Sequence, residues 1–203
     1  MGGVGIIILA AGASRRMGQP KQLLVFDGQT LLDRTIDLAR NIQEGPLMVV
    51  FGAGITEIRQ GLSNKDFSWV ENTLWPSGMS SSIRCGLTAI LKEHPNLKAI
   101  LFLLVDQPLI GVDHLKQVLE TWRKNQSLIV AARYRETLGV PVLFDRRLFP
   151  ELLELTGDKG AKPLLKSYSD QLLAIDLPAA ALDLDTPTAW QAFLQRMQKR
   201  KTP

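Results

Sequence analysis

The residues best suited to chemistry stand in the segment IIILAAGASRRMGQPK, at positions 6–21. A short apolar run leads directly into a loop that contains Gly12, three cationic residues and no acidic residue; the cations are Arg15, Arg16 and Lys21. Glycine allows the backbone to approach a ligand closely, and guanidinium and ammonium groups attract anions. The segment therefore predicts a phosphate-binding loop.

Two common phosphate motifs do not fit the glycines of this chain. A P-loop has four residues between its first glycine and the Gly-Lys pair, whereas five residues separate Gly12 from Gly18. Further along, an apolar run at positions 47–51 leads into Gly-Ala-Gly at positions 52–54, as in a dinucleotide site. Glu57 occupies the third glycine position of that motif, so an NAD(P) site is the weaker interpretation.

Aspartate residues that follow apolar runs could supply a metal site. Asp106 comes after the run at positions 99–105, and Asp183 and Asp185 lie in LDLDTP near the end of the chain. Ligands of an open parallel sheet collect beyond the carboxyl ends of its strands. Mg²⁺ takes one or two carboxylates and completes its shell with phosphate oxygens and water, so Asp106 and Asp185 predict a magnesium site. In the alternative interpretation, Asp106 caps a turn and Asp185 caps the last helix.

Two loops could hold other parts of a phosphorylated ligand. Positions 78–82, GMSSS, offer three hydroxyls and several backbone amides before a helix, which suits a sugar or a base. The same segment could simply be a serine-rich helix cap. Positions 156–162, TGDKGAK, could bind a second anion through Lys159 and Gly160, or could form an ordinary turn between helices.

The elements that would position these residues alternate along the chain. Short runs rich in Val, Ile and Leu predict strands that are buried on both faces, at positions 4–10, 47–51, 99–105 and 128–132. Helical spacing lies between them, at positions 31–42, 56–62, 81–92 and 114–124. The alternation predicts a three-layer α/β/α sandwich around a mostly parallel, Rossmann-like sheet.

The rhythm changes from about position 134. A short strand at 141–144 and helices near 148–155 and 161–168 predict an excursion from the sheet over positions 134–170. The chain then returns through a strand at 172–175 to a closing helix, with Asp185 or Thr186 as its cap and Pro187 in its first turn. We expect one domain over residues 1–203.

Composition limits the classes of partner. The chain has 203 residues, 45% of them hydrophobic and 22% charged, which suits a globular protein with a sizeable core. Its net charge is +4, but aromatic residues do not interleave with the basic ones, so an anionic small molecule is favoured over nucleic acid. No apolar run approaches the ~20 residues of a membrane span, and no basic region precedes the first strand. We therefore expect a cytoplasmic protein that binds no membrane.

The few cysteine and histidine residues argue against thiol and zinc chemistry. Cys85 is the single cysteine, which excludes an internal disulfide. His94 and His114 do not stand at the spacing of zinc ligands. We expect Cys85 to be packed on a helix face instead of acting as a nucleophile.

The segment LAAGASRRMGQPKQLL resembles the signature LAAGxSxRMGxxK of the cytidylyltransferase-like nucleotidyltransferases, which share a Rossmann-like sheet. Five further segments stand in the same order as in the molybdenum cofactor cytidylyltransferases of the MobA-like NTP transferase family: WPSGMSSSIRCGL, LLVDQPL, PVLFDRRLFPELLEL, GDKGAKPLL and LDLDTPTAW. The resemblance implies a Mg²⁺-dependent enzyme with the nucleotide-diphospho-sugar transferase type of fold. It would transfer NMP, most readily CMP from CTP, to a phosphorylated acceptor such as molybdopterin, release pyrophosphate and serve a molybdenum hydroxylase.

The resemblance also implies roles for individual residues. The nucleotide would rest on the backbone of Leu9, Ala10, Ala11 and Gly12, and its triphosphate would be held by the catalytic pair Arg16 and Lys21. The base and ribose would contact the segment 78–82, through Gly78, Ser80, Ser81 and Ser82. Mg²⁺ would bind Asp106, which is also catalytic, and Asp185. The acceptor side would comprise Gly139, Pro141, Lys159 and Asp183, while Arg15 becomes a surface residue.

One departure from the family pattern leaves the substrates less defined than the reaction class. Relatives commonly have GHP before the VLF strand, whereas this chain has Val140 in place of the histidine. LAAG, where other members have LAGG, favours CTP over GTP. Two other functions stay open: a non-catalytic protein that binds a cofactor and passes it to a molybdenum hydroxylase, and a cytidylyltransferase for another acceptor such as methylerythritol phosphate.

Overall fold

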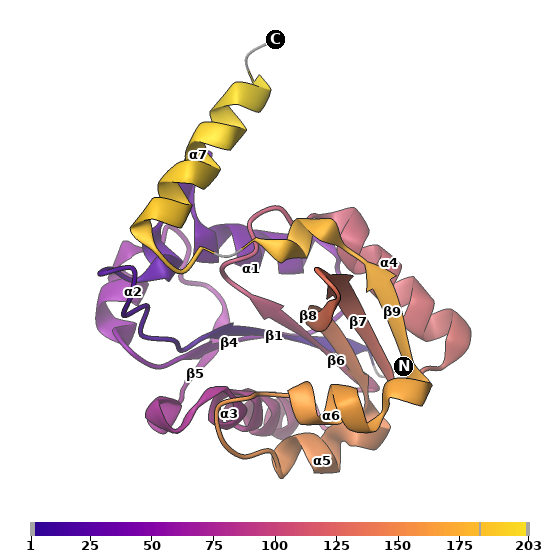
Figure 1. Ribbon diagram of the computed structural model, residues 1–203. Coiled ribbons are helices and arrows are strands. Elements are labelled where there is room, and N and C mark those ends of the chain that lie inside the picture. The colour runs from indigo at the N-terminus through magenta and orange to yellow at the C-terminus, as the bar shows by residue number, and fades with distance from the viewer. Residues whose placement is uncertain (1–2, 183, 202–203) are drawn as a thin grey trace.

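The computed structural model describes residues 3–182 and 184–201. A seven-stranded sheet with the strand order β5-β4-β1-β6-β8-β7-β9 forms the centre of the described chain (Figure 1). The strands are β1 (Val4–Ala10), β4 (Leu47–Phe51), β5 (Ser68–Glu71), β6 (Ala99–Leu104), β7 (Ile129–Tyr134), β8 (Thr137–Asp145) and β9 (Leu172–Asp176). A separate two-stranded hairpin consists of β2 (Val25–Phe26) and β3 (Gln29–Thr30).

The sheet is covered on both faces because its central strands are apolar at every position. Along β1, Ile6 and Ile8 join one buried cluster, whereas Ile7 and Leu9 join the other. The first cluster packs against α1 (Leu31–Asn41), α2 (Ile55–Gly61), α4 (Val112–Asn125) and α7 (Pro187–Lys201). The second packs against α3 (Met79–Glu93), α5 (Phe149–Leu153) and α6 (Lys162–Ser167). The predicted three-layer α/β/α sandwich is confirmed.

The strand at residues 137–145 corrects the expected excursion over positions 134–170. β8 does not leave the sheet but lies inside it, antiparallel to both β6 and β7. It follows β7 through a tight turn in which Arg135 and Glu136 have φ angles of 47° and 59°. Neither residue is the glycine or asparagine that usually marks such a turn, so the hairpin carried no local signal. The α-helices that follow β8, α5 and α6, lie outside the sheet, beside α3 on one face (Figure 1).

The edges of the structure show two further features. No strand was predicted at β5, because this edge strand has four residues, SWVE, most of them exposed, and so forms no long apolar run. α7 contacts the body through Trp190 and Phe193, and the ring of Phe193 lies 4.8 Å from that of Phe26. The rest of α7 projects away from the layers (Figure 1). No helix within the described ranges has the length and apolarity needed to cross a membrane.

Candidate functional site

The carboxyl ends of β1 and β6 meet at one edge of the sheet. The two strands are parallel, and Leu9 pairs with Leu104. The cationic loop leaves the end of β1, and Asp106 follows the end of β6 by two residues. The topology therefore brings the predicted phosphate loop and the predicted metal ligand to the same place.

Lys21 joins the two predicted metal ligands directly. Its ammonium donates hydrogen bonds to Asp106 Oδ2 at 2.8 Å and to Asp185 Oδ1 at 2.5 Å. The guanidinium of Arg16 pairs with the other carboxylate oxygen of Asp185. Three segments that lie far apart in the sequence thus form one charged cluster: the loop after β1, the turn after β6 and the segment before α7.

The charges in this cluster shift the pKa values of its members. Burial alone would lower the pKa of Lys21, but the charges of Asp106 and Asp185 and their hydrogen bonds outweigh it and raise the pKa above its ordinary value. The hydrogen bond from Lys21 is the main reason that the pKa of Asp185 is lowered. Lys21 is therefore a cation and Asp185 an anion at neutral pH.

The capping alternative for Asp185 is resolved by its neighbour. Thr186 caps α7, since its Oγ1 accepts a hydrogen bond from the amide of Ala189 at 3.2 Å. Its carbonyl oxygen accepts from the amide of Trp190 at 3.0 Å. Asp185 instead directs its carboxylate toward Lys21 and Arg16.

Gln22 and Ser14 shape the phosphate loop, although the sequence did not single them out. The side-chain amide of Gln22 donates to the carbonyl oxygens of Ala10 at 2.6 Å and Gly12 at 3.3 Å. The backbone amide of Lys21 donates to Ser14 Oγ at 3.1 Å. The signal available was PKQLL itself, where a polar glutamine stands before two leucines at the start of a short 3₁₀ helix (Lys21–Leu23).

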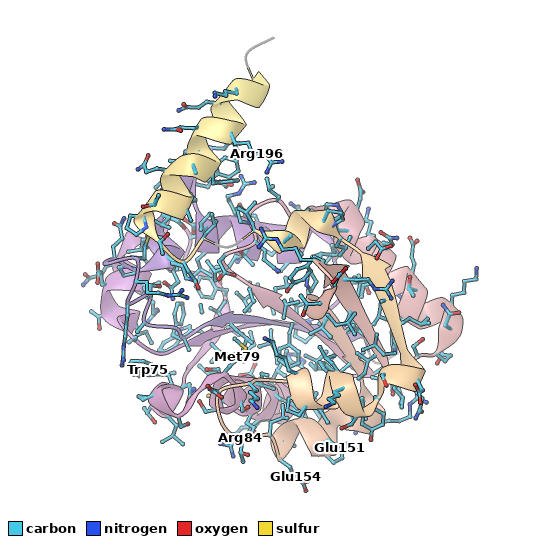
Figure 2. The ribbon with its side chains drawn as sticks, viewed as in Figure 1. Trp75, Met79, Arg84, Glu151, Glu154 and Arg196 are labelled. Atoms are coloured by element: carbon cyan, nitrogen blue, oxygen red, sulfur yellow. The ribbon has the colours of Figure 1, made fainter. Side chains whose placement is uncertain are left out.

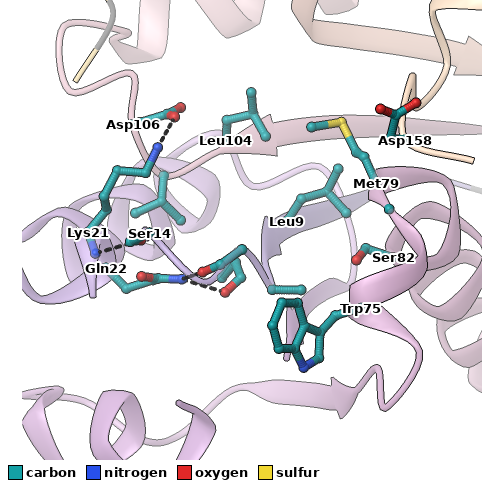
Figure 3. Close-up of a pocket in the computed structure, with 15 residues that line it drawn as sticks. Leu9, Ser14, Lys21, Gln22, Trp75, Met79, Ser82, Leu104, Asp106 and Asp158 are labelled. Atoms are coloured by element: carbon teal, nitrogen blue, oxygen red, sulfur yellow. Dashed lines mark hydrogen bonds and ion pairs between the residues drawn. The ribbon is translucent and has the colours of Figure 1, made fainter. Parts of the chain in front are cut away.

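A cavity of about 350 Å³ opens beside this cluster. In Figure 3, Lys21 and Asp106 lie at one end, whereas Met79 and Asp158 lie at the other, with Leu9 and Leu104 between them. Lys21 thus supplies a cation at one end and the middle is apolar, which suits a ligand with a phosphate chain and a flat ring. The lining residues are Leu9, Ala10, Ala11, Gly12, Ser14, Lys21, Gln22, Trp75, Gly78, Met79, Ser82, Leu104, Val105, Asp106 and Asp158.

The serines of the segment 78–82 have different environments. Ser82 lines the cavity, and its hydroxyl accepts a hydrogen bond from Asn72 Nδ2 at 3.0 Å. Ser80 is fully buried, and its hydroxyl donates to the carbonyl oxygen of Thr156 at 3.1 Å. Ser81 contacts the carbonyl oxygens of Leu74 and Gly78. Among the four residues predicted to contact base and ribose, Gly78 and Ser82 face the cavity, whereas the hydroxyls of Ser80 and Ser81 bond to protein groups.

The TGDKGAK loop packs against the start of α3. Gly78 has a φ of 107°, and a Cβ atom at this position would stand only 2.5 Å from the Cα of Asp158. The amide of Ser80 donates to the carbonyl oxygen of Gly157 at 3.3 Å. This close packing brings the side chain of Asp158 to the cavity wall, whereas Lys159, the predicted anion ligand, is exposed and is not among the lining residues. Figure 2 shows Trp75 and Met79 on the same side of the sheet as Arg84, which is in α3.

Of the predicted acceptor-side residues, Gly139 and Pro141 are described by the structure but are not among the residues that line the cavity. Gly139 and Pro141 are in β8, and the hydroxyl of Tyr134 occupies the space that a side chain on Gly139 would need. Burial and the negative charge of Asp106 both raise the pKa of Tyr134, so this phenol lies near the charged cluster. Gln107 donates to the carbonyl oxygen of Val140 at 2.7 Å. Asp183 lies outside the described residues.

Three other sequence hypotheses have structural answers. Arg15 is exposed, whereas Arg16 forms an ion pair with Asp185. Gly52 packs against the end of β1, where a Cβ atom would stand 2.7 Å from the carbonyl oxygen of Ala11, so strand packing explains this glycine without a dinucleotide. Cys85 is half-buried in α3, and burial raises the pKa of its thiol.

The cluster fits a metal ion that is completed by its substrate. Within the described ranges, no group of three or more Asp, Glu, His or Cys side chains could hold an ion by itself. Asp106 and Asp185 already share one cation, the Lys21 ammonium, which stands in for a metal between two carboxylates. Hard oxygen donors of this kind suit Mg²⁺ or Mn²⁺ once phosphate oxygens supply the remaining ligands.

Comparisons with known proteins identify the family of the chain. The chain matches the MobA-like NTP transferase domain over residues 6–172. It is 30% identical to the nicotine blue oxidoreductase of Paenarthrobacter nicotinovorans, over 92% of this chain and 93% of that protein. It is also 30% identical to the bifunctional protein GlmU of Coxiella burnetii, but there it spans only 34% of the relative's length.

Solved structures show the same architecture over nearly the whole chain. The crystal structure of Rv0371c from Mycobacterium tuberculosis superposes with a TM-score of 0.81 at 30% identity, covering 96% of this chain and 98% of that one. A complex of Rv0371c with manganese superposes with a TM-score of 0.76 at 28% identity, covering 95% and 98% of the two chains. Together with the charged cavity at the end of β1, these matches show that the chain belongs to the MobA-like NTP transferase family and is a nucleotidyltransferase.

Proposed function

We propose that the enzyme transfers CMP from CTP to a phosphorylated small molecule, with molybdopterin as the favoured acceptor, and releases pyrophosphate. The observation that carries the proposal is the convergence of Lys21, Asp106 and Asp185 at the charged end of a cavity whose floor is the loop after β1. The preference for CTP and molybdopterin rests on the resemblance of the ordered motifs. A molybdenum hydroxylase as recipient follows from the same resemblance, whereas a cytoplasmic location is our expectation from the sequence alone.

The reaction needs little beyond alignment and neutralisation of charge. An acceptor phosphate is already anionic at neutral pH, so its oxygen attacks the α-phosphorus without a general base. A new bond forms between that oxygen and the α-phosphorus, while the bond from the α-phosphorus to the bridging oxygen breaks and pyrophosphate leaves with the electron pair. Lys21 and Arg16 neutralise the phosphates and hold them in line, because groups that are already oriented lower the barrier most.

Asp106 and Asp185 would hold a divalent cation, for which Mg²⁺ is our proposal. Such an ion supplies further neutralisation of the transferring phosphoryl group when bound. The loop after β1 would orient the nucleotide, with Gln22 holding the carbonyls of Ala10 and Gly12 away from the phosphates. The apolar middle of the cavity would receive the base.

The test measures pyrophosphate release with each of the four NTPs, Mg²⁺, and either molybdopterin or methylerythritol phosphate. We expect release with CTP and molybdopterin. Arg16→Ala and Asp106→Ala should each lower turnover about 100-fold or more, as for other removals of transition-state charge stabilisation, while circular dichroism shows a retained fold. Arg15→Ala is the matched control, since it removes an equal charge from an exposed neighbour and should change turnover little.

The outcomes separate the candidate functions. Near-normal turnover in both Arg16→Ala and Asp106→Ala would contradict the assignment. Binding of CTP and molybdopterin without pyrophosphate release would favour a cofactor carrier, and release only with methylerythritol phosphate would change the acceptor. Absorbance of NADPH, followed in a parallel assay, tests an oxidoreductase.

A further inference from the structure

Lys21 occupies the position that a metal ion would need. Its ammonium lies 2.8 Å from Asp106 Oδ2 and 2.5 Å from Asp185 Oδ1, so both carboxylates turn toward the same cation. The side chain of Lys21 is only 18% exposed, and those of Asp106 and Asp185 are 28% and 29% exposed. A divalent cation cannot bind between these oxygens while the ammonium remains there, because two cations would share one place at contact distance.

The same lysine is the residue to which the triphosphate would bind. An ammonium on a flexible four-carbon stem can exchange one anionic partner for another by rotation of its side chain. The backbone of Lys21 stays in place during this exchange. Its amide donates a hydrogen bond to Ser14 Oγ at 3.1 Å, and the side chain of the next residue, Gln22, donates one to the carbonyl oxygen of Ala10 at the end of β1. Exchange therefore requires no movement of the loop.

We propose that Lys21 closes the metal site of the free enzyme and opens it when a triphosphate arrives. In the free protein, Lys21 holds Asp106 and Asp185 against a bare divalent cation. When phosphate oxygens accept the hydrogen bonds of the Lys21 ammonium, the two carboxylates become available to bind the metal ion that accompanies the nucleotide. This inference rests on the proposed function, because it assumes that the cavity binds a nucleoside triphosphate.

The consequence is that metal and nucleotide favour each other's binding. A ligand that binds better to the open arrangement shifts the protein toward it, and the coupling acts equally in both directions. Arg16 contributes to the closed arrangement through the second oxygen of Asp185, and its side chain is 68% exposed and free to turn. The enzyme would thereby take up the metal with its substrate and bind free divalent ions weakly.

Binding of Mn²⁺ alone tests the first half of the proposal. Free Mn²⁺ is counted by electron paramagnetic resonance in titrations of the wild-type protein, Lys21→Met and the control Lys98→Met. Lys98 is exposed and lies at the opposite end of β6, so this control removes the same charge far from the site. We expect Lys21→Met to bind Mn²⁺ about tenfold more tightly than the wild type, and Lys98→Met to match the wild type. Adding Asp106→Asn to Lys21→Met should abolish the gain.

Relaxation of water protons tests the second half, because it reports Mn²⁺ that is bound to protein in the presence of CTP. The wild type should show strong enhancement only when CTP is present, whereas Lys21→Met should show it with Mn²⁺ alone. Equal or weaker Mn²⁺ binding by Lys21→Met would overturn the proposal, as would a gain that persists with Asp106→Asn. Neither readout uses turnover, so failure of the proposed function, seen as no pyrophosphate release from any NTP, is recognised separately.

Discussion

The side-chain amide of Gln22 donates a hydrogen bond to the carbonyl oxygen of Ala10 at 2.6 Å, and so ties the residue after Lys21 to the last residue of β1. Gln22 is 4% exposed, and it also contacts the carbonyl oxygen of Gly12. Its Oε1 atom is buried and has no hydrogen-bond partner among the described residues. The side-chain amide of Gln22 thus donates its hydrogen bonds to the loop, whereas its carbonyl oxygen beside the cavity accepts none from the described residues.

Replacing Gln22 tests whether this amide shapes the loop. Gln22→Met keeps the length of the side chain but leaves two carbonyls without their donor, which should cost about 1–3 kcal/mol of unfolding free energy. Urea denaturation measures this cost, and calorimetric titration with CTP should show weaker binding. Gln19→Met, on the exposed part of the same loop, is the control and should change neither quantity. Unchanged stability and affinity in Gln22→Met would show that the loop holds its shape without the amide.

Acid should weaken the fold through Asp145. This buried carboxylate accepts hydrogen bonds from Trp122 Nε1 at 3.0 Å and from Arg147 Nε at 2.7 Å. Burial would raise the pKa of Asp145, but the hydrogen bonds from Arg147 and Trp122 outweigh it and lower the pKa. A lowered pKa in the folded state means that the stabilisation is complete above the ordinary pKa of about 3.9 and is lost as the pH falls through the lower folded value.

The measurement compares the wild type with Asp145→Asn in urea denaturation from pH 7 to pH 3. The wild type should be more stable at pH 7, and the difference should shrink below about pH 4 as Asp145 takes up a proton. Asp170→Asn, at an exposed position in a short 3₁₀ helix (Ser169–Gln171), serves as the control with an equal change of charge. A difference between wild type and Asp145→Asn that stays constant over this range would rule out the ionised carboxylate as its source.

A methyl group at Gly78 should displace the loop that carries Asp158. Gly78→Ala combines a φ of 107° with a Cβ atom 2.6 Å from the carbonyl oxygen of Gly157. Gly157→Ala is the matched variant, because its φ is 77° but the space around its Cβ position is open. Backbone strain of this kind costs about 1–3 kcal/mol, so both variants should lose stability.

Gly78→Ala should lose more than Gly157→Ala, since only it also clashes with backbone atoms. Thermal unfolding measures the stability of each variant. Calorimetric titration with CTP measures the effect on the cavity wall, and Gly78→Ala should bind CTP more weakly. An equal loss of stability in the two variants would mean that the loop moves to accommodate the methyl group at Gly78 without further destabilisation.

Elements were predicted correctly from the sequence where the pattern of their own residues was sufficient to identify them. The strands at residues 4–10 and 47–51 were predicted with the bounds that the structure gives, because a run that is apolar at every position can be buried on both faces. β8 was expected outside the sheet, because its place between β6 and β7 depends on pairing with β6, which is distant in sequence, and on a turn after β7 that lacks glycine. The edge strand β5 is only four residues long and mostly exposed, so its apolar residues formed no run long enough to predict a strand.

The sequence by itself determined the sandwich and the cationic loop after its first strand, because hydrophobic periodicity and local charge act between neighbouring residues. Only the tertiary structure decided which charges meet. Lys21 reaches Asp106 and Asp185 over separations of 85 and 164 residues, and such contacts follow from strand order and not from local pattern. The same applies to Ser80, whose hydroxyl looked available for a ligand but is directed to Thr156 by the packing of the following loop. Local sequence patterns predict which residues have suitable side chains, whereas long-range packing determines which groups those side chains contact.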